Sequence, residues 1–242
     1  MDVNSYFCLK FSWMKKIIFI VFLLYSSIVF AQHKPFQFGF KGAANLGWFG
    51  TDVKDYSNEG VEFGGSWGFV ADIYLMENYA FTTGFDVLFL NGSMRYPYAM
   101  QDTIDMAVLG QMESKFKAKY IEIPLIFTMR TNEIGKVKIF GQIGFGFGIL
   151  LDAKANNTFI PDNGQSIESS EGEDPGIFRP TRESFIIGAG IEIPLDGSTF
   201  IRTGIRYDNA FIDVLKGNNT ADLSIENDAR NNFIEFNLCL IF

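Results

Sequence analysis

Strict alternation of apolar with polar or small side chains runs through most of this chain and limits its fold more than any other feature. At the start of the pattern, Phe36, Phe38 and Phe40 alternate with Gln37 and Gly39. A period of two residues is typical of a β-strand whose two faces meet different surroundings. The pattern recurs in eight segments, which we predict to be strands: 36–48, 66–75, 79–92, 120–130, 137–151, 184–195, 199–208 and 233–242.

The two faces of the predicted strands differ sharply in composition. One face is almost purely apolar, whereas the opposite face mixes glycine, serine and charged residues. A membrane barrel turns its apolar face to lipid and can enclose polar residues. A soluble β-sandwich would instead bury the apolar face against a second sheet, so the strands alone leave both architectures open.

The lengths of the connections separate these two architectures. Three connections are short, at 76–78, 131–136 and 196–198, and the other four are long, polar and acidic: 49–62, 93–119, 152–183 and 209–232. Outer-membrane barrels have short periplasmic turns and long external loops, whereas a sandwich has no reason to sort its loops in this way. We therefore predict an all-β fold, an eight-stranded antiparallel up-and-down transmembrane β-barrel. It would lie in the lipid of the cell outer membrane, with short periplasmic turns and long external loops.

The N-terminal segment has the features of a secretory signal peptide. Lys15 and Lys16 precede an apolar run, 17–30, which is followed by Ala31. The competing interpretation is an anchoring helix, but the run is shorter than the roughly 20 residues that a spanning helix needs. We expect cleavage after Ala31, with 1–31 as the signal region and 32–242 as the barrel domain. Residues 1–13 would be an extension from a misassigned start, because Met14 begins a complete signal.

Several motifs resemble those of a known family. The segment 119–125 reads Lys-Tyr-Ile-Glu-Ile-Pro-Leu, and further landmarks are Thr83-Gly84, Arg206-Tyr207 and the terminal Phe242. In these residues the chain resembles the PorT-like outer-membrane β-barrel proteins of Gram-negative bacteria. The resemblance implies an eight-stranded barrel in the outer membrane, and as an alternative function an accessory component of a type IX-like secretion system. The terminal phenylalanine also resembles the signal read by the outer-membrane assembly machinery, a partner during insertion.

The sequence offers little support for catalysis, cofactors or metals. The sole histidine, His33, lies close to the predicted cleavage site, so a histidine base within the barrel is excluded. The glycines at 141–148 lie on an alternating strand with no helix after it and no lysine directly after the glycines, which does not fit a phosphate-binding loop. The acidic stretches 171–174 and 218–228 match no calcium-loop spacing. We expect no cofactor and no metal, and an enzyme that processes lipid or peptide at the rim is the least favoured alternative.

Charged residues on the inward face predict a polar network inside the barrel. The tight turn at 196–198 sets Glu192 directly across from Arg202 in antiparallel register. An enclosed charge is costly unless it is paired, so we expect a structural network centred on this pair, with Arg206 reaching Glu235 or Glu122. The predicted members are Asp72, Asp86, Glu122, Glu192, Arg202, Arg206 and Glu235.

Eight strands enclose a space that side chains largely fill, so no wide pore is expected. Inward Tyr74, Phe140 and Leu150 would block it further. The net charge of −8 argues against a nucleic-acid partner. These features favour a non-enzymatic barrel with a structural or surface-interaction role, whose long loops contact envelope or secretion proteins.

Overall fold

The computed structural model describes residues 35–101, 107–162, 164, 167–168, 172–173 and 176–242. The predicted cleavage site after Ala31 and the sole histidine lie outside these residues. The chain divides into two units, Met1–Phe36 and Gln37–Phe242, and the second unit contains the barrel. Among the residues that the structure describes, no helix is long and apolar enough to cross a membrane.

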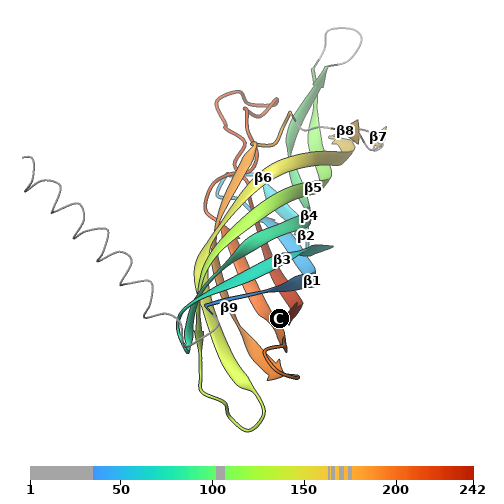
Figure 1. Ribbon diagram of the computed structural model, residues 1–242. Helices are drawn as coiled ribbons and strands as arrows, with labels where there is room; N and C mark the ends of the chain where they lie inside the picture. The colour runs from blue at the N-terminus through green and yellow to red at the C-terminus, as the bar shows by residue number, and fades with distance from the viewer. Residues whose placement is uncertain (1–34, 102–106, 163, 165–166, 169–171, 174–175) are drawn as a thin grey trace, which may run out of the picture. The chain divides into compact units, whose positions relative to one another are not determined.

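Eight long strands form a closed antiparallel ring, which confirms the predicted eight-stranded up-and-down barrel (Figure 1). Each strand pairs with its neighbour along the chain, and the last pairs with the first from Gly39↔Ile241 to Gly50↔Arg230. Three short strands, β2 (Ser57–Gly60), β7 (Ile167–Glu168) and β8 (Gly172–Glu173), pair with β4 or β6. The ring consists of β1 (Phe36–Gly50), β3 (Glu62–Met76), β4 (Tyr79–Gln101), β5 (Ala107–Arg130), β6 (Lys138–Pro161), β9 (Thr181–Pro194), β10 (Phe200–Ala210) and β11 (Arg230–Ile241).

The alternation in the sequence becomes the inside and the outside of the barrel. On β5 the outward Ile123, Leu125, Phe127 and Met129 are exposed, whereas the residues between them are buried. An outward apolar band is the surface that contacts lipid in barrels of this type. The short turns and the long connections lie at opposite ends of the barrel, which in barrels of this type are the periplasmic and the external end respectively.

Placing a charge in this apolar band should destabilise the barrel. Ile187 lies midway along β9 and its side chain is 49% exposed on the outer face. Ile187→Arg should cost about 2–4 kcal/mol, because lipid cannot solvate the guanidinium near the midplane. Urea unfolding in lipid vesicles measures the loss. Leu223→Arg, in an external loop, is the matched control and should have little effect, so equal losses would contradict the lipid-facing assignment.

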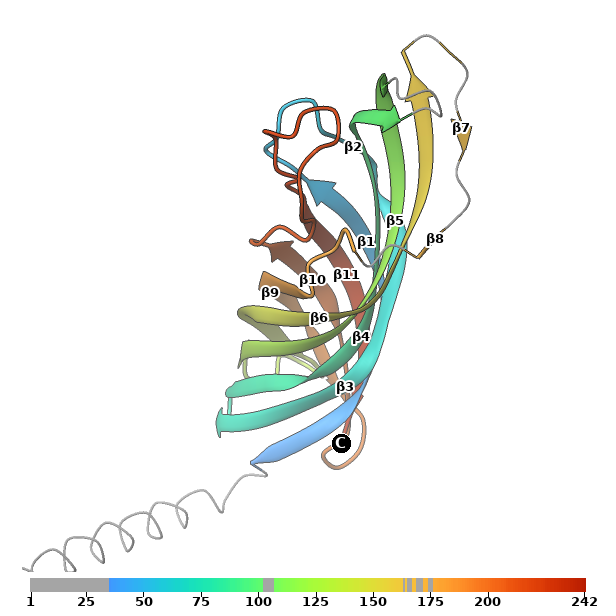
Figure 2. The ribbon, with the colours of Figure 1, turned by 90° about the horizontal axis from the view of Figure 1, so that it is seen from above.

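Two predicted loops are wrong in extent, because strands continue through them. The segment 93–119 belongs mostly to a hairpin of β4 and β5, which pair from Tyr79↔Met129 to Gln101↔Ala107. Residues 152–161 likewise continue β6. Figures 1 and 2 show these strands reaching beyond the others at the external end. Beyond the membrane the outward positions become polar, although polar and apolar residues still alternate. From the sequence, these segments are therefore predicted to be loops.

Two of the motifs that resemble the PorT-like family meet in the structure. The β4–β5 register runs from Thr82↔Ile126 to Asp86↔Glu122, which places Gly84 opposite Pro124. Gly84 has a φ of +147°, and a Cβ atom there would lie 1.9 Å from the carbonyl oxygen of Phe69. Only glycine fits this position, and proline has no N–H to donate across the ladder.

Candidate functional site in the lumen and at the external mouth

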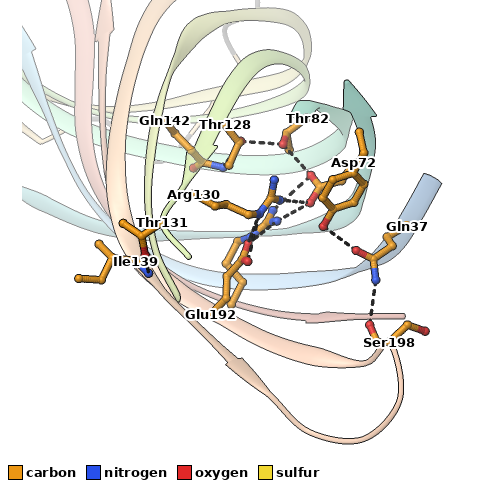
Figure 3. A network of polar contacts seen from close by, with 12 residues as sticks. Gln37, Asp72, Thr82, Thr128, Arg130, Thr131, Ile139, Gln142, Glu192 and Ser198 are labelled. Carbon is orange, nitrogen blue, oxygen red and sulfur yellow. Dashed lines mark hydrogen bonds and ion pairs between the residues drawn. The ribbon is translucent and has the colours of Figure 1, made fainter. Parts of the chain in front are cut away.

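Four charged side chains close the periplasmic end of the lumen. We call Asp72, Arg130, Glu192 and Arg202 the periplasmic cluster. Glu192 and Arg202 lie opposite each other on β9 and β10, with Arg202 Nη2 2.8 Å from Glu192 Oε1. Arg130 donates from Nε to both oxygens of Glu192, at 2.9 and 3.0 Å, and both arginines donate to Asp72 (Figure 3). Two carboxylates and two guanidinium groups therefore balance in charge.

Neutral side chains extend the periplasmic cluster to the barrel wall. Thr82 donates to Asp72 Oδ1 at 2.6 Å, and its hydroxyl lies 2.7 Å from that of Thr128. The Tyr74 hydroxyl donates to the side-chain oxygen of Gln37 at 2.6 Å. The side-chain nitrogen of Gln37 in turn donates to the carbonyl oxygen of Ser198 at 2.8 Å (Figure 3). The neutral side chains around the periplasmic cluster thus come from β1, β3, β4 and β5.

A second group of charges fills the middle of the lumen. We call Lys41, Asp86, Glu122, Arg182, Arg206, Asp208 and Glu235 the central cluster. Arg206 binds Glu122 and also lies 2.9 Å from Asp208, which accepts a 2.6 Å bond from Arg182. Lys41 Nζ bridges Asp86 at 2.6 Å and Glu235 at 2.8 Å. Four carboxylates thus meet three cations, all of them almost fully buried.

The structure places all seven sequence-predicted charges in these two clusters. Of the two partners left open for Arg206, the ion pair is with Glu122, and Glu235 instead pairs with Lys41 and accepts a 2.7 Å bond from Ser66. Sequence reasoning missed four members: Lys41, Arg130, Arg182 and Asp208. Alternation would have placed Lys41 and Asp208 inward, but Arg182 fell within a predicted loop because β9 begins earlier than expected.

The external half of the lumen is filled by an apolar plug. Phe116 on β5 makes edge contacts with Phe49 and Phe178, at ring-centroid distances of 5.5 and 5.4 Å. Phe178 and Leu215 come from predicted external loops, yet both are buried. We correct that expectation: parts of both loops fold back because their apolar side chains leave water for the plug. The buried members are Phe49, Tyr56, Leu88, Leu90, Met94, Phe116, Ala118, Tyr120, Ala153, Ala155, Phe178, Val214, Leu215, Ala229 and Phe233.

Above the plug lies a cavity of about 490 Å³, which we call the mouth cavity. Tyr56 and Tyr96 stack on its wall with ring centroids 5.5 Å apart. Asn219 Nδ2 donates to the Tyr56 hydroxyl at 2.7 Å and to the carbonyl oxygen of Pro97 at 2.8 Å. The hydroxyl in turn donates to Asn227 Oδ1 at 2.7 Å. These bonds tie the external loop after β10 to the β4–β5 hairpin.

Two carboxyl groups in the same external loop should make its stability depend on pH. Burial, followed by the neighbouring carboxyl of Asp213, raises the pKa of Asp228 to about 6. The folded loop then keeps a proton that the unfolded chain has already released above a pH of about 4. Stability should therefore fall as the pH rises from about 4 to about 6 and level off above that.

Amide hydrogen exchange of residues 211–229 measures this effect. We expect more protection at pH 5 than at pH 7.5, and Asp228→Asn should remove the difference. Asp222→Asn is the matched control in the same loop, because a hydrogen bond from Ser224 lowers the pKa of that exposed carboxyl. An unchanged pH dependence in Asp228→Asn would contradict the prediction.

The oxygen-rich stretches considered for calcium look different in the structure. Glu171 and Asp174 lie outside the described residues. Asp222 accepts bonds from the backbone N–H and the hydroxyl of Ser224, at 2.9 and 2.7 Å. Within the part of the chain that the structure describes, no three His, Cys, Asp or Glu side chains gather in a way that could hold a metal ion.

A family model for the outer membrane protein beta-barrel domain matches residues 30–216. The chain belongs to this family. It is an outer-membrane protein, embedded through its apolar band in outer-membrane lipid. A search of curated protein sequences gave no match.

Solved structures of other outer-membrane proteins resemble this outer-membrane barrel only weakly. Neisserial surface protein A is 12% identical, with a TM-score of 0.41, and the match covers 85% of this chain and 96% of that one. Ail, the attachment invasion locus protein of Yersinia pestis, is 13% identical at a TM-score of 0.35, covering 85% and 98%. OprG from Pseudomonas aeruginosa is 9% identical with a TM-score of 0.37, and the match covers 87% of this chain and 97% of that one.

Proposed function

We propose that this protein is a non-enzymatic outer-membrane barrel whose working surface is the external mouth. The observation that carries the proposal is the contrast between the filled interior of the lumen and its external mouth. The inside is closed by the periplasmic cluster, the central cluster and the apolar plug, and the void beside Lys41 and Arg206 is only about 40 Å³. The mouth cavity is more than ten times larger and opens among the external loops.

The lumen clusters support a structural role better than a catalytic one. Each carboxylate in them accepts a bond or ion pair from at least one cation, and the periplasmic cluster balances completely. A general base needs a proton-accepting group free to reach a substrate. Carboxylates held by two arginines, as Asp72 and Glu192 are, are poor candidates for that task.

The working surface can be tested by shortening the β4–β5 hairpin. Replacing residues 96–112 with an Asn-Gly turn keeps the register, because Arg95 already pairs with Glu113. The shortened and full-length proteins would be cross-linked in intact cells, and the captured envelope proteins compared. A partner that is lost only from the shortened chain supports the proposal.

The same experiment distinguishes the competing role in secretion. A variant in which the periplasmic turn 131–136 is replaced is the matched control. A partner lost from that variant, but retained by the shortened hairpin, would favour an accessory component of a type IX-like secretion system. Ion conductance across a planar bilayer is the second readout, since the proposal expects no steady channel from the closed lumen.

A further inference from the structure

Three lysines line up on the outer face of β5 directly beyond the apolar band. Lys115, Lys117 and Lys119 take successive outward positions, and the residues between them, including Phe116 and Ala118, are buried in the plug. Lys115 and Lys117 are exposed, and Lys119 is half-buried. Pairing with β4 and β6 on both sides holds all three on one surface, with a β-bulge in the β6 pairing between Lys119 and Tyr120.

The neighbouring strands add one further lysine and two acidic residues to this surface. On β4 the residues opposite Lys117 and Lys115 are Asn91 and Ser93. On β6 a fourth lysine, Lys154, lies opposite Lys117, and Asp152 lies opposite Lys119. On its other side Lys154 lies opposite Glu173 of β8, so four lysines face two acidic residues. We call Lys115, Lys117, Lys119 and Lys154 the lysine row. The cluster stands out because the chain as a whole is acidic, with a net charge of −8.

The height of the lysine row coincides with the membrane surface. The last outward apolar residues below it are Phe89 on β4, Ile121 on β5 and Leu151 on β6. Lys119 precedes Ile121 by two residues and lies about 7 Å farther out along the strand, and its Nζ lies 5.5 Å from the centre of the Phe89 ring. Arg95, farther out, lies 3.2 Å from both Glu59 and Glu113, so the basic surface ends there.

We propose that the lysine row binds the phosphate groups of anionic lipids in the leaflet around the external end of the barrel. The ammonium groups lie where headgroups must be, because the apolar band ends one outward position below them. Lysines at this depth keep their apolar stems against the strand and extend their charge to the interface. The attraction between basic residues and anionic lipids extends only about one Debye length from the membrane surface. The lysine row therefore acts on the lipids that border the barrel.

The proposal can be tested by lipid selectivity in a reconstituted bilayer. The full barrel would be placed in phosphatidylcholine vesicles containing a trace of spin-labelled phosphatidic acid or spin-labelled phosphatidylcholine. Electron spin resonance then measures the relative association of each lipid with the protein. We expect a preference for phosphatidic acid of about five-fold or more at low salt. The preference should disappear in roughly 1 M salt, where the Debye length is about 3 Å.

Two matched triple variants separate a local site from net charge. K115Q/K117Q/K119Q should bring the preference close to one. K54Q/K136Q/K216Q removes the same charge from exposed positions elsewhere and should retain most of the preference. The heat-dependent gel mobility of each variant confirms that it is folded. An unchanged preference in the first variant, an equal loss in both, or a preference that survives high salt would overturn the proposal.

Discussion

Replacing Arg202 with methionine should lower the free energy of unfolding by about 3–5 kcal/mol. Arg202 is the shared partner of Glu192 and Asp72, and its side chain is only 3% exposed. The substitution leaves two buried carboxylates with Arg130 as the single cation of the periplasmic cluster. Urea unfolding of the barrel in detergent or lipid vesicles measures the loss.

A double-mutant cycle shows whether the loss arises from the pair. Arg202→Met combined with Glu192→Gln should cost less than the sum of the single changes, because the double variant restores the balance of charge. Arg230→Met is a control, since Arg230 pairs with the largely exposed Asp52 and such pairs contribute at most about 1 kcal/mol. Strict additivity would show that Arg202 and Glu192 do not depend on each other.

Phe116→Ala should lower the free energy of unfolding by a similar amount, about 3–5 kcal/mol, because it leaves a cavity in the apolar plug. Phe116 is 2% exposed and contacts rings from β1 and from the loop before β9. The loss should appear both in global unfolding and as faster protease cleavage of residues 209–229, whose buried residues pack in the same plug.

Phe127→Ala is the matched control for the plug on the same strand. Phe127 points outward and is 37% exposed, so truncation there leaves space that lipid can fill. Its cost should be clearly smaller than that of Phe116→Ala. Equal costs, with unchanged proteolysis of the external loop, would show that the plug does not couple the loop to the barrel.

Local periodicity was enough to predict the architecture. A strand exposes its side chains alternately, so the apolar and polar faces of 36–48 or 184–195 can be read without any knowledge of their neighbours. The short turns at 76–78 and 196–198 then set which strands pair and in which register. The opposition of Glu192 and Arg202 follows from the second turn alone, because antiparallel pairing is determined by counting outward from it.

The ends of the strands could not be predicted in the same way. The inner face of 111–119 is mostly apolar, at Met112, Phe116 and Ala118, and its outer face is polar, the reverse of the membrane segment that follows. A prediction that identifies strands by their outward apolar residues assigns such a stretch to a loop. Only the partner strand shows that the ladder continues, as at Lys117↔Lys154.

The sequence by itself determined the number of strands in the ring, the face of nearly every side chain in them and the pairing of hairpin neighbours, because these depend on the alternation and on the length of each turn. The tertiary structure alone decided which residues meet across the lumen. Arg130 reaches Glu192, and Arg182 joins Glu122, through contacts that link strands far apart in sequence. Such contacts depend on the tilt and stagger of the closed ring, which no single strand encodes.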